Sequence, residues 1–305
     1  MDWSCIPIES DPSDDADAAS RYDPEVIMKH LRTSVFVAFL IVFAFFVVYE
    51  DYLARHTDVS YPEIRFDSGT LSLPVTASDE DLLSGVTAYD EKDGDITSRI
   101  IVESISNFSS PGVSTVTYAV VDNDDHAVKA HRTLIYTDYV HPRFTFQSDM
   151  IFEAGTKFNL LDLIGATDVI DGDISEKVKL ISSELNTSVP GVYQCQAQVT
   201  NSKGDVSYLE FNVTITGATD LPLDVELTDY LIYLNVGDTF IPGDYYKDTL
   251  RFGTPVDVGF PLIQNGVSTK TAGTYKAYYD QETADGAQGV AELLVIVEDE
   301  HDSRN

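Results

Sequence analysis

Six aspartates in two short acidic loops have the strongest potential for chemistry in this sequence. In each loop three carboxylates lie within six residues and a glycine bends the chain; they are Asp90, Asp93 and Asp95, and Asp168, Asp171 and Asp173. Carboxylates at this density can converge on a hard cation such as calcium, which takes about six to eight oxygen ligands. The segment 122–125, Asp-Asn-Asp-Asp, could add further oxygens. The spacing is not that of an EF-hand loop.

The same aspartates have a second interpretation, in which they only form the turn. Asp side chains accept hydrogen bonds from nearby backbone N–H groups, and Gly adopts the left-handed conformations that tight turns require. Calcium binding and turn formation are therefore both open for these two loops.

The remaining reactive side chains form no catalytic or zinc-binding pattern. The six histidines make neither an HExxH motif nor a metal-spaced pair with a cysteine. There is no GxSxG nucleophile elbow, no phosphate-binding loop and no dinucleotide fingerprint. Cys195 alternates with Tyr193 and Ala197, which favours a buried small side chain over a nucleophile. We predict a protein that is not an enzyme.

The acidic loops are part of an internal repeat with a period of about 80 residues. The pattern A-x-D-x-x-D-G-D-I occurs at 88–96 and again at 166–174, and Pro-Gly-Val occurs at 111–113 and at 190–192. Ala-Gly-Thr-Tyr at 272–275 marks a third, degenerate copy that lacks the D-G-D-I element. The repeat indicates a duplicated domain.

Each copy contains short runs rich in Val, Ile, Thr, Tyr and Phe between Gly, Pro, Asn and Asp clusters, which indicates many short strands. After the glycine of each copy, apolar residues alternate as in a half-buried strand: Val116, Tyr118 and Val120; Cys195, Ala197 and Val199; Tyr275, Ala277 and Tyr279. With roughly seven strands per copy, the predicted fold class is all-β, built from tandem Ig-like β-sandwiches. The expected ranges are 62–138, 139–217 and a divergent 218–298, with a polar tail at 299–305. The spacing of the repeats implies short linkers, so we expect the domains to form a stalk of independent beads.

These motifs resemble the bacterial Ig-like domain family related to the hyalin repeat, which recurs in bacterial surface proteins and some pesticidal crystal proteins. The resemblance covers 62–138 and 139–217, and in the third copy only the part from Gly273 on. It implies an extracellular structural or binding module without enzymatic activity.

One apolar stretch, residues 33–49, indicates the cellular location of the chain. It holds no charged residue, and from Val35 to Val48 every side chain is apolar. A membrane-spanning helix needs about 17–25 such residues. Lys29 and Arg32 precede it while Glu50 follows, so the basic side is expected in the cytoplasm. We predict a single-pass protein of the cell membrane, with an acidic, mostly disordered cytoplasmic tail at 1–32, a linker at 50–61 and an extracellular C-terminus.

The alternative for this stretch is a cleaved secretory signal, because its purely apolar run is only 14 residues long. The segment before it is long and acidic, and no small-x-small triplet follows it, so an uncleaved signal anchor is favoured.

Charge and cysteine content limit the partners. The net charge is −32, of which residues 1–32 contribute −5 and the predicted outer part −27. Such a surface repels phosphates, so nucleic acid is excluded as a partner.

The only two cysteines, Cys5 and Cys195, are predicted on opposite sides of the membrane and cannot pair. An exported region without internal disulfides is more typical of a bacterial surface protein than of an animal one.

The leading functional hypothesis is adhesion or scaffolding at a bacterial cell surface, through an unknown protein or carbohydrate ligand. The first two domains would be a spacer and the divergent third domain the contact surface. The alternative is an accessory subunit of a secretion, division or cell-wall assembly complex, in which the sandwiches dock partner ectodomains.

Overall fold

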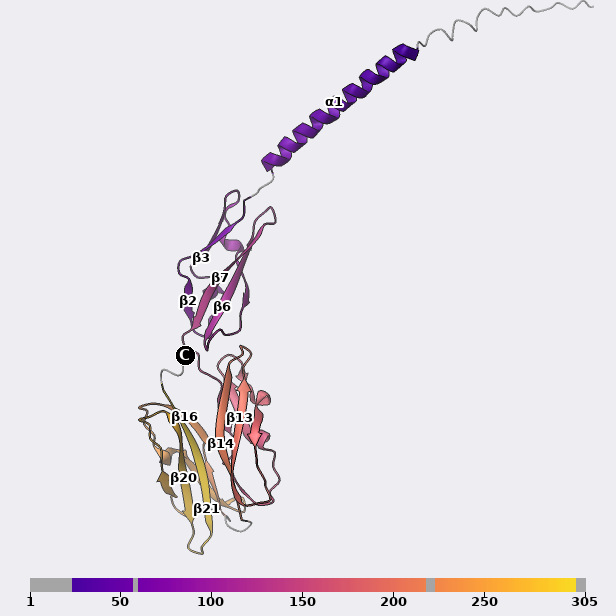
Figure 1. Cartoon of the computed structure of the whole chain (residues 1–305). Coiled ribbons are helices and arrows are strands. Elements are labelled where there is room, and N and C mark those ends of the chain that lie inside the picture. Colours follow the sequence, from indigo (N-terminus) through magenta and orange to yellow (C-terminus); the bar gives the residue numbers. More distant parts are fainter. Residues whose placement is uncertain (1–23, 57–59, 218–222, 300–305) are drawn as a thin grey trace, which may run out of the picture. The chain divides into compact units, whose positions relative to one another are not determined.

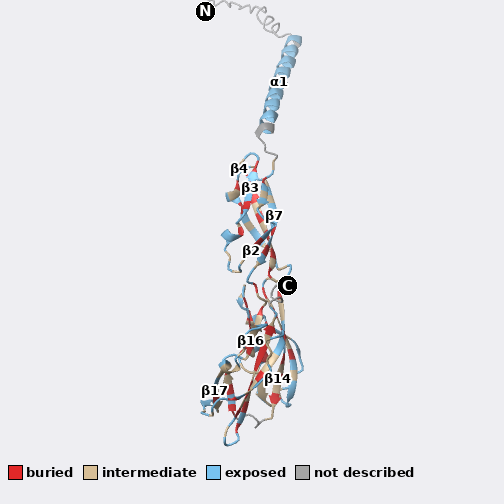
Figure 2. Ribbon diagram, turned by 90° about the vertical axis from the view of Figure 1, so that its left-hand side faces the viewer, coloured by how far each residue is buried: buried red, intermediate tan, exposed pale blue. Residues whose placement is uncertain are grey.

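The computed structural model describes residues 24–56, 60–217 and 223–299 and separates the chain into two compact units, 1–60 and 61–305. The described part of the first unit is dominated by one helix, α1 (Pro24–His56) (Figure 1). All of its described side chains are exposed, as Figure 2 shows, and an 18-residue window has a mean hydropathy of 2.5. By length and composition α1 could cross a membrane.

α1 is longer at both ends than the predicted span at 33–49. Pro24 suits a first helical turn, where its missing N–H has no partner to lose, and no Gly or Pro interrupts the rest of the helix. Residues 24–32 and 50–56, expected as tail and linker, therefore continue the helix. The expectations for residues 1–23, 57–59, 218–222 and 300–305 lie outside the described residues.

The second unit contains three β-sandwiches, each with a three-stranded and a four-stranded sheet. The first consists of β1 (Glu63–Phe66), β2 (Thr70–Leu73), β3 (Val86–Asp90), β4 (Gly94–Asp95), β5 (Ile101–Ile105), β6 (Val113–Val121) and β7 (Ala127–Tyr136). The second consists of β8 (Arg143–Phe146), β9 (Ile151–Glu153), β10 (Ile164–Asp168), β11 (Gly172–Asp173), β12 (Lys179–Ser183), β13 (Gly191–Thr200) and β14 (Val206–Thr216). The third consists of β15 (Leu223–Leu227), β16 (Leu231–Asn235), β17 (Tyr246–Arg251), β18 (Thr254–Pro255), β19 (Leu262–Asn265), β20 (Gly273–Glu282) and β21 (Gln288–Glu298).

All three sandwiches share one topology. Their sheets have the orders β1-β3-β4 with β2-β7-β6-β5, β8-β10-β11 with β9-β14-β13-β12, and β15-β17-β18 with β16-β21-β20-β19. In each, the second strand pairs in parallel with the last, and the other pairs are antiparallel. The short helices are α2 (Asp79–Leu82), η2 (Thr97–Arg99), η3 (Leu160–Leu163), η4 (Ser175–Lys177) and η5 (Pro242–Tyr245). The third copy therefore keeps the fold although its sequence has diverged.

The predicted alternation after each glycine is confirmed. Along β6, β13 and β20 buried side chains alternate with more exposed ones. Tyr118 and Tyr279 are fully buried at corresponding positions of the first and third sandwiches. Their hydroxyls donate to the backbone carbonyls of Leu82 and Pro242, at 2.6 and 2.7 Å. Burial of these tyrosines therefore leaves no unsatisfied hydroxyl.

The second and third sandwiches pack against each other, contrary to the expectation of independent beads, although the third also has a buried core of its own. Leu231 and Leu294 of the third sandwich belong to the buried cluster of the second. The Phe144 N–H donates to the Tyr233 hydroxyl at 2.9 Å, and the Arg143 guanidinium lies 4.9 Å from the Tyr233 ring. The outer face of the third sandwich's large sheet carries apolar side chains where it meets the second sandwich. Contact with the second sandwich removes this apolar surface from water.

Stability at this junction should depend on pH through Asp149. Burial, followed by the negative charge of Asp224 and then of Glu292, raises the pKa of the Asp149 carboxyl to about 8. Glu292 itself pairs with Lys276 at 2.7 Å. Between about pH 5 and pH 8 the folded state holds a proton that the unfolded state has lost. The free energy of unfolding should therefore fall by up to about 1.4 kcal/mol per pH unit as the pH rises.

Urea unfolding at a series of pH values tests this effect. The Asp149→Asn variant should lose this part of the slope and be the more stable protein at pH 8, because it carries no charge to bury. An identical slope in wild type and variant would contradict the assignment.

Candidate functional site: the aspartate turns and the first linker

The first aspartate of each acidic loop forms the turn. Asp90 ends β3, is 1% exposed, and accepts hydrogen bonds through Oδ1 from the N–H groups of Lys92 and Asp93, both at 2.9 Å. Asp168 ends β10 and accepts in the same way from Ile170 and Asp171. The loop glycines, Gly94 and Gly172, have φ values of 75° and 72°, which favour a residue without a side chain.

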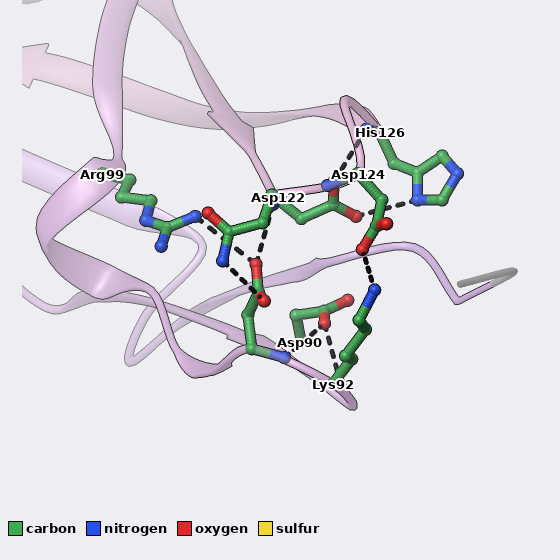
Figure 3. A network of polar contacts seen from close by, with 8 residues as sticks. Asp90, Lys92, Arg99, Asp122, Asp124 and His126 are labelled. Atoms are coloured by element: carbon green, nitrogen blue, oxygen red, sulfur yellow. Dashed lines mark hydrogen bonds and ion pairs between the residues drawn. The ribbon is translucent and has the colours of Figure 1, made fainter. Parts of the chain in front are cut away.

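The second aspartate ties its loop to the turn between the two long strands of the large sheet. Figure 3 shows this network in the first sandwich. Asp93 accepts from both the backbone N–H and the side-chain amide of Asn123, each at 2.8 Å, and Arg99 lies 3.4 Å away. In the second sandwich Asp171 accepts from the Ser202 N–H at 2.7 Å and pairs with Lys177 at 2.9 Å.

The third aspartate of each loop lies two residues before a short 3-10 helix and binds the first residue of that helix. Asp95 accepts from the Thr97 N–H and Asp173 from the Ser175 N–H, both at 2.9 Å. These hydrogen bonds, led by those from the Thr97 and Ser175 side chains, lower the pKa of both carboxyls. All six aspartates thus have hydrogen-bond donors of their own chain, in the same arrangement in both copies.

The turns opposite these loops contain a second set of buried polar groups. Asp122 accepts from the N–H groups of Asp124 and His126 and contacts the His126 ring nitrogen at 2.8 Å. Burial acts to raise the pKa of Asp122, but the hydrogen bonds, first among them the one from His126, bring it below its ordinary value. Asn201 occupies the corresponding place in the second sandwich and accepts from Asp205 N–H at 2.9 Å.

Tyr139, in the linker between the first two sandwiches, joins both. Its ring meets the Phe108 ring of the first sandwich edge-on at 4.7 Å, and a Cβ at Gly112 would come within 3.2 Å of it. Its hydroxyl donates to Asp205 of the second sandwich and accepts from the Asn201 amide at 3.0 Å. Burial, and after it the Asp205 carboxylate, raise the pKa of Tyr139, so the hydroxyl keeps its proton.

Two further contacts join the parts of the chain on either side of this junction. His141 lies 2.7 Å from Asp205, and the Phe108 N–H donates to the Lys203 carbonyl at 3.0 Å. The Asn201 amide also donates to Asp168 at 3.1 Å, which connects the linker to the aspartate loop. The D-x-x-D-G-D-I motif thus supports the turn that receives the linker.

Calcium binding by Asp90, Asp93, Asp95, Asp168, Asp171 and Asp173 stays a prediction. Within residues 24–56, 60–217 and 223–299, no group of three or more His, Cys, Asp or Glu side chains is arranged to hold a metal ion. A cation would have to replace hydrogen bonds such as Asn123–Asp93 and ion pairs such as Lys177–Asp171.

Sequence reasoning missed Tyr139, Asn201 and Asp205 as parts of this site. The signal for the turn was present, because Asp122 and Asn201 begin the same D/N-x-x-G/D pattern after the alternating strand. No local pattern indicates that a linker tyrosine reaches a residue 66 positions away. Cys195 is 1% exposed, and burial raises the pKa of its thiol, as expected of a structural residue.

Two segments of the chain match a known family. Residues 73–135 and 143–215 match the bacterial surface protein Ig-like domain. The pesticidal crystal protein Cry22Aa of Bacillus thuringiensis is 30% identical over 251 residues, which cover 79% of this chain but only 34% of that protein.

Solved structures with some similarity include CBM51 and INT domains of Clostridium perfringens ZmpB and a protocadherin gammaB7 fragment. The ZmpB structure, which contains GlcNAc, is 22% identical, with a TM-score of 0.22 over 48% of this chain and 26% of that one. The protocadherin is 13% identical, with a TM-score of 0.19 over 79% of this chain and 76% of that one. These TM-scores are too low to transfer any property.

Proposed function

We propose, from the premise that residues 73–135 and 143–215 are bacterial surface Ig-like domains, that this chain is a membrane-anchored protein of the bacterial cell surface. It would display its sandwiches outside the membrane for adhesion or as a scaffold, without catalysis. The activity of Cry22Aa is not part of the proposal, because the chain spans about a third of that protein.

The observation that carries the proposal is α1, an apolar helix with every described side chain exposed, ahead of surface-type domains. At about 1.5 Å per residue its 33 residues measure roughly 50 Å, more than the roughly 30 Å of bilayer hydrocarbon. Its polar ends would then reach the headgroups. Lys29 and Arg32 precede the apolar stretch and Glu50 and Asp51 follow it, which favours a cytoplasmic N-terminus.

The buried linker supports a scaffold role. Tyr139 is 5% exposed and is held by Asn201 and Asp205. A fixed linker transmits position from one domain to the next, which a spacer needs and a mobile tether does not provide.

The accessory-subunit alternative predicts a different result when the anchor is exchanged. Residues 1–49 are replaced by an unrelated single-pass anchor of the same orientation, and cell-to-surface attachment and growth are measured. An adhesin or scaffold should keep its attachment activity, because its working parts lie beyond the membrane. Loss of function with normal surface levels would instead identify a machine subunit whose helix and tail contact its partners.

A further inference from the structure

The third sandwich replaces the aspartate loop with an exposed aromatic hairpin. Its β17–β18 hairpin occupies the place of β3–β4 and β10–β11 in the shared topology. The turn residues Phe252 and Gly253 have φ values of 52° and 74°, and Phe252 is 89% exposed. A phenylalanine in the left-handed backbone region is uncommon. Burial of the Phe252 side chain does not offset the cost of this conformation, because the side chain is exposed.

A groove next to this hairpin has one wall made by Phe260 and Leu262, which are 61% and 70% exposed. The Phe260 ring is held in place: it meets the Tyr246 ring edge-on at 5.2 Å, and a Cβ at Gly243 would lie 3.4 Å from its tip. The groove encloses about 650 Å³ of space, within the range of small-molecule sites. Phe260 therefore presents an exposed aromatic ring whose position is already fixed by its neighbours, and such a ring is a preformed apolar surface for a ligand.

The polar side chains of the groove are amides and carboxylates. Gln264 donates to Asp280 at 2.6 Å, and Gln288 lies on the same side of the sheet. Gln281 lines the groove while only 6% exposed; its amide N–H donates to the Val258 carbonyl at 3.1 Å, and its Oε1 is buried without a partner. A buried acceptor without a donor costs free energy until a donor arrives.

We propose that this groove binds a neutral saccharide. No lysine or arginine lines it, so an anionic ligand would meet only the carboxylates of Asp280 and Glu282. A pyranose ring offers an apolar C–H face for Phe260 and hydroxyls that donate to acceptors and accept from amides, which is the combination found here. A basic peptide would satisfy the carboxylates and its backbone would pair with the glutamine amides, so it is the competing ligand in the test.

This inference rests on the proposed function and specifies its ligand class. The full chain is placed in lipid nanodiscs, because sugar-based detergents would compete for the groove. Saturation-transfer NMR is then recorded with hexamers of β-linked glucose, mannose, galactose and N-acetylglucosamine, and with hexalysine as the basic-peptide probe. At least one saccharide should bind with a dissociation constant of about 1 mM or lower, with the largest transfer to its C–H protons.

Phe260→Ala should weaken that binding at least about tenfold and Gln288→Ala severalfold, whereas Phe252→Ala, an equally apolar but non-lining change, should leave it unchanged. Melting temperatures verify that each variant is folded. The proposal is overturned if no saccharide binds, if Phe260→Ala binds as wild type, or if hexalysine binds in the saccharides' place. Because binding in nanodiscs does not depend on orientation in the cell, failure here is distinct from failure of the surface assignment.

Discussion

Replacing Tyr139 with alanine should lower the free energy of unfolding of the second sandwich by about 3–5 kcal/mol. The side chain is 5% exposed and fills the space between Phe108 and the Asn201–Asp205 turn. Alanine removes the ring contact and takes the hydroxyl donor away from the buried Asp205. The first two sandwiches should then move independently, because the linker loses its contacts with Phe108 and Asp205.

Urea unfolding of the full chain, read by hydrogen exchange in β13 and β14, measures this effect. Tyr139→Phe keeps the ring and removes only the hydroxyl, so it should cost about 1–3 kcal/mol. Tyr208→Ala is the matched control, because Tyr208 lies on β14 but is 60% exposed, and it should stay within about 0.5 kcal/mol of wild type. If Tyr139→Ala cost no more than Tyr208→Ala, the linker would not be held as described.

Replacing Asp168 with alanine should destabilise the second sandwich by about 2–4 kcal/mol. Its carboxylate accepts from two backbone N–H groups and from the Asn201 amide, and alanine removes all three of these hydrogen bonds. Asp173→Ala is the control, because that carboxylate is exposed and accepts hydrogen bonds only from Ser175, so its loss should cost clearly less. Denaturant unfolding of both variants gives the comparison, and equal losses would refute a special role for Asp168.

Calcium separates the two interpretations of the aspartate loops in the same variants. If the loops are hydrogen-bonded turns, wild type should melt at the same temperature in calcium and in chelator. The contacts of Asp171 with Ser202 and Lys177 favour this result. If they bind calcium, the melting temperature should rise with calcium in wild type and rise less in Asp168→Ala, which removes a ligand from one of the two loops, because a ligand that binds only the folded state stabilises it.

Local patterns in the sequence were sufficient to predict the sandwiches. The alternation at Val116, Tyr118 and Val120 follows from the two-residue period of a strand, and it is buried as expected. The turn role of Asp90 and Asp168 was also available, because Asp and Gly act on residues two or three positions away. Both features depend on neighbours in the chain.

Features that join distant segments were not predictable in the same way. Tyr139 meets Asp205 only after two sandwiches have folded, and Leu231 looks like an ordinary strand residue until the second sandwich covers it. The groove beside Phe260 depends on residues from β19, β20 and β21. In the sequence, only the loss of the D-G-D-I element in the third copy indicated that this sandwich differs.

Protease treatment of intact cells tests the surface assignment most directly. With an epitope tag at each end of the chain, external protease should remove the C-terminal tag and leave a short membrane-bound fragment that retains the N-terminal tag, while a cytoplasmic marker stays intact. A C-terminal tag that survives on intact cells but is degraded in lysates would show the sandwiches to be inside, and would contradict the account.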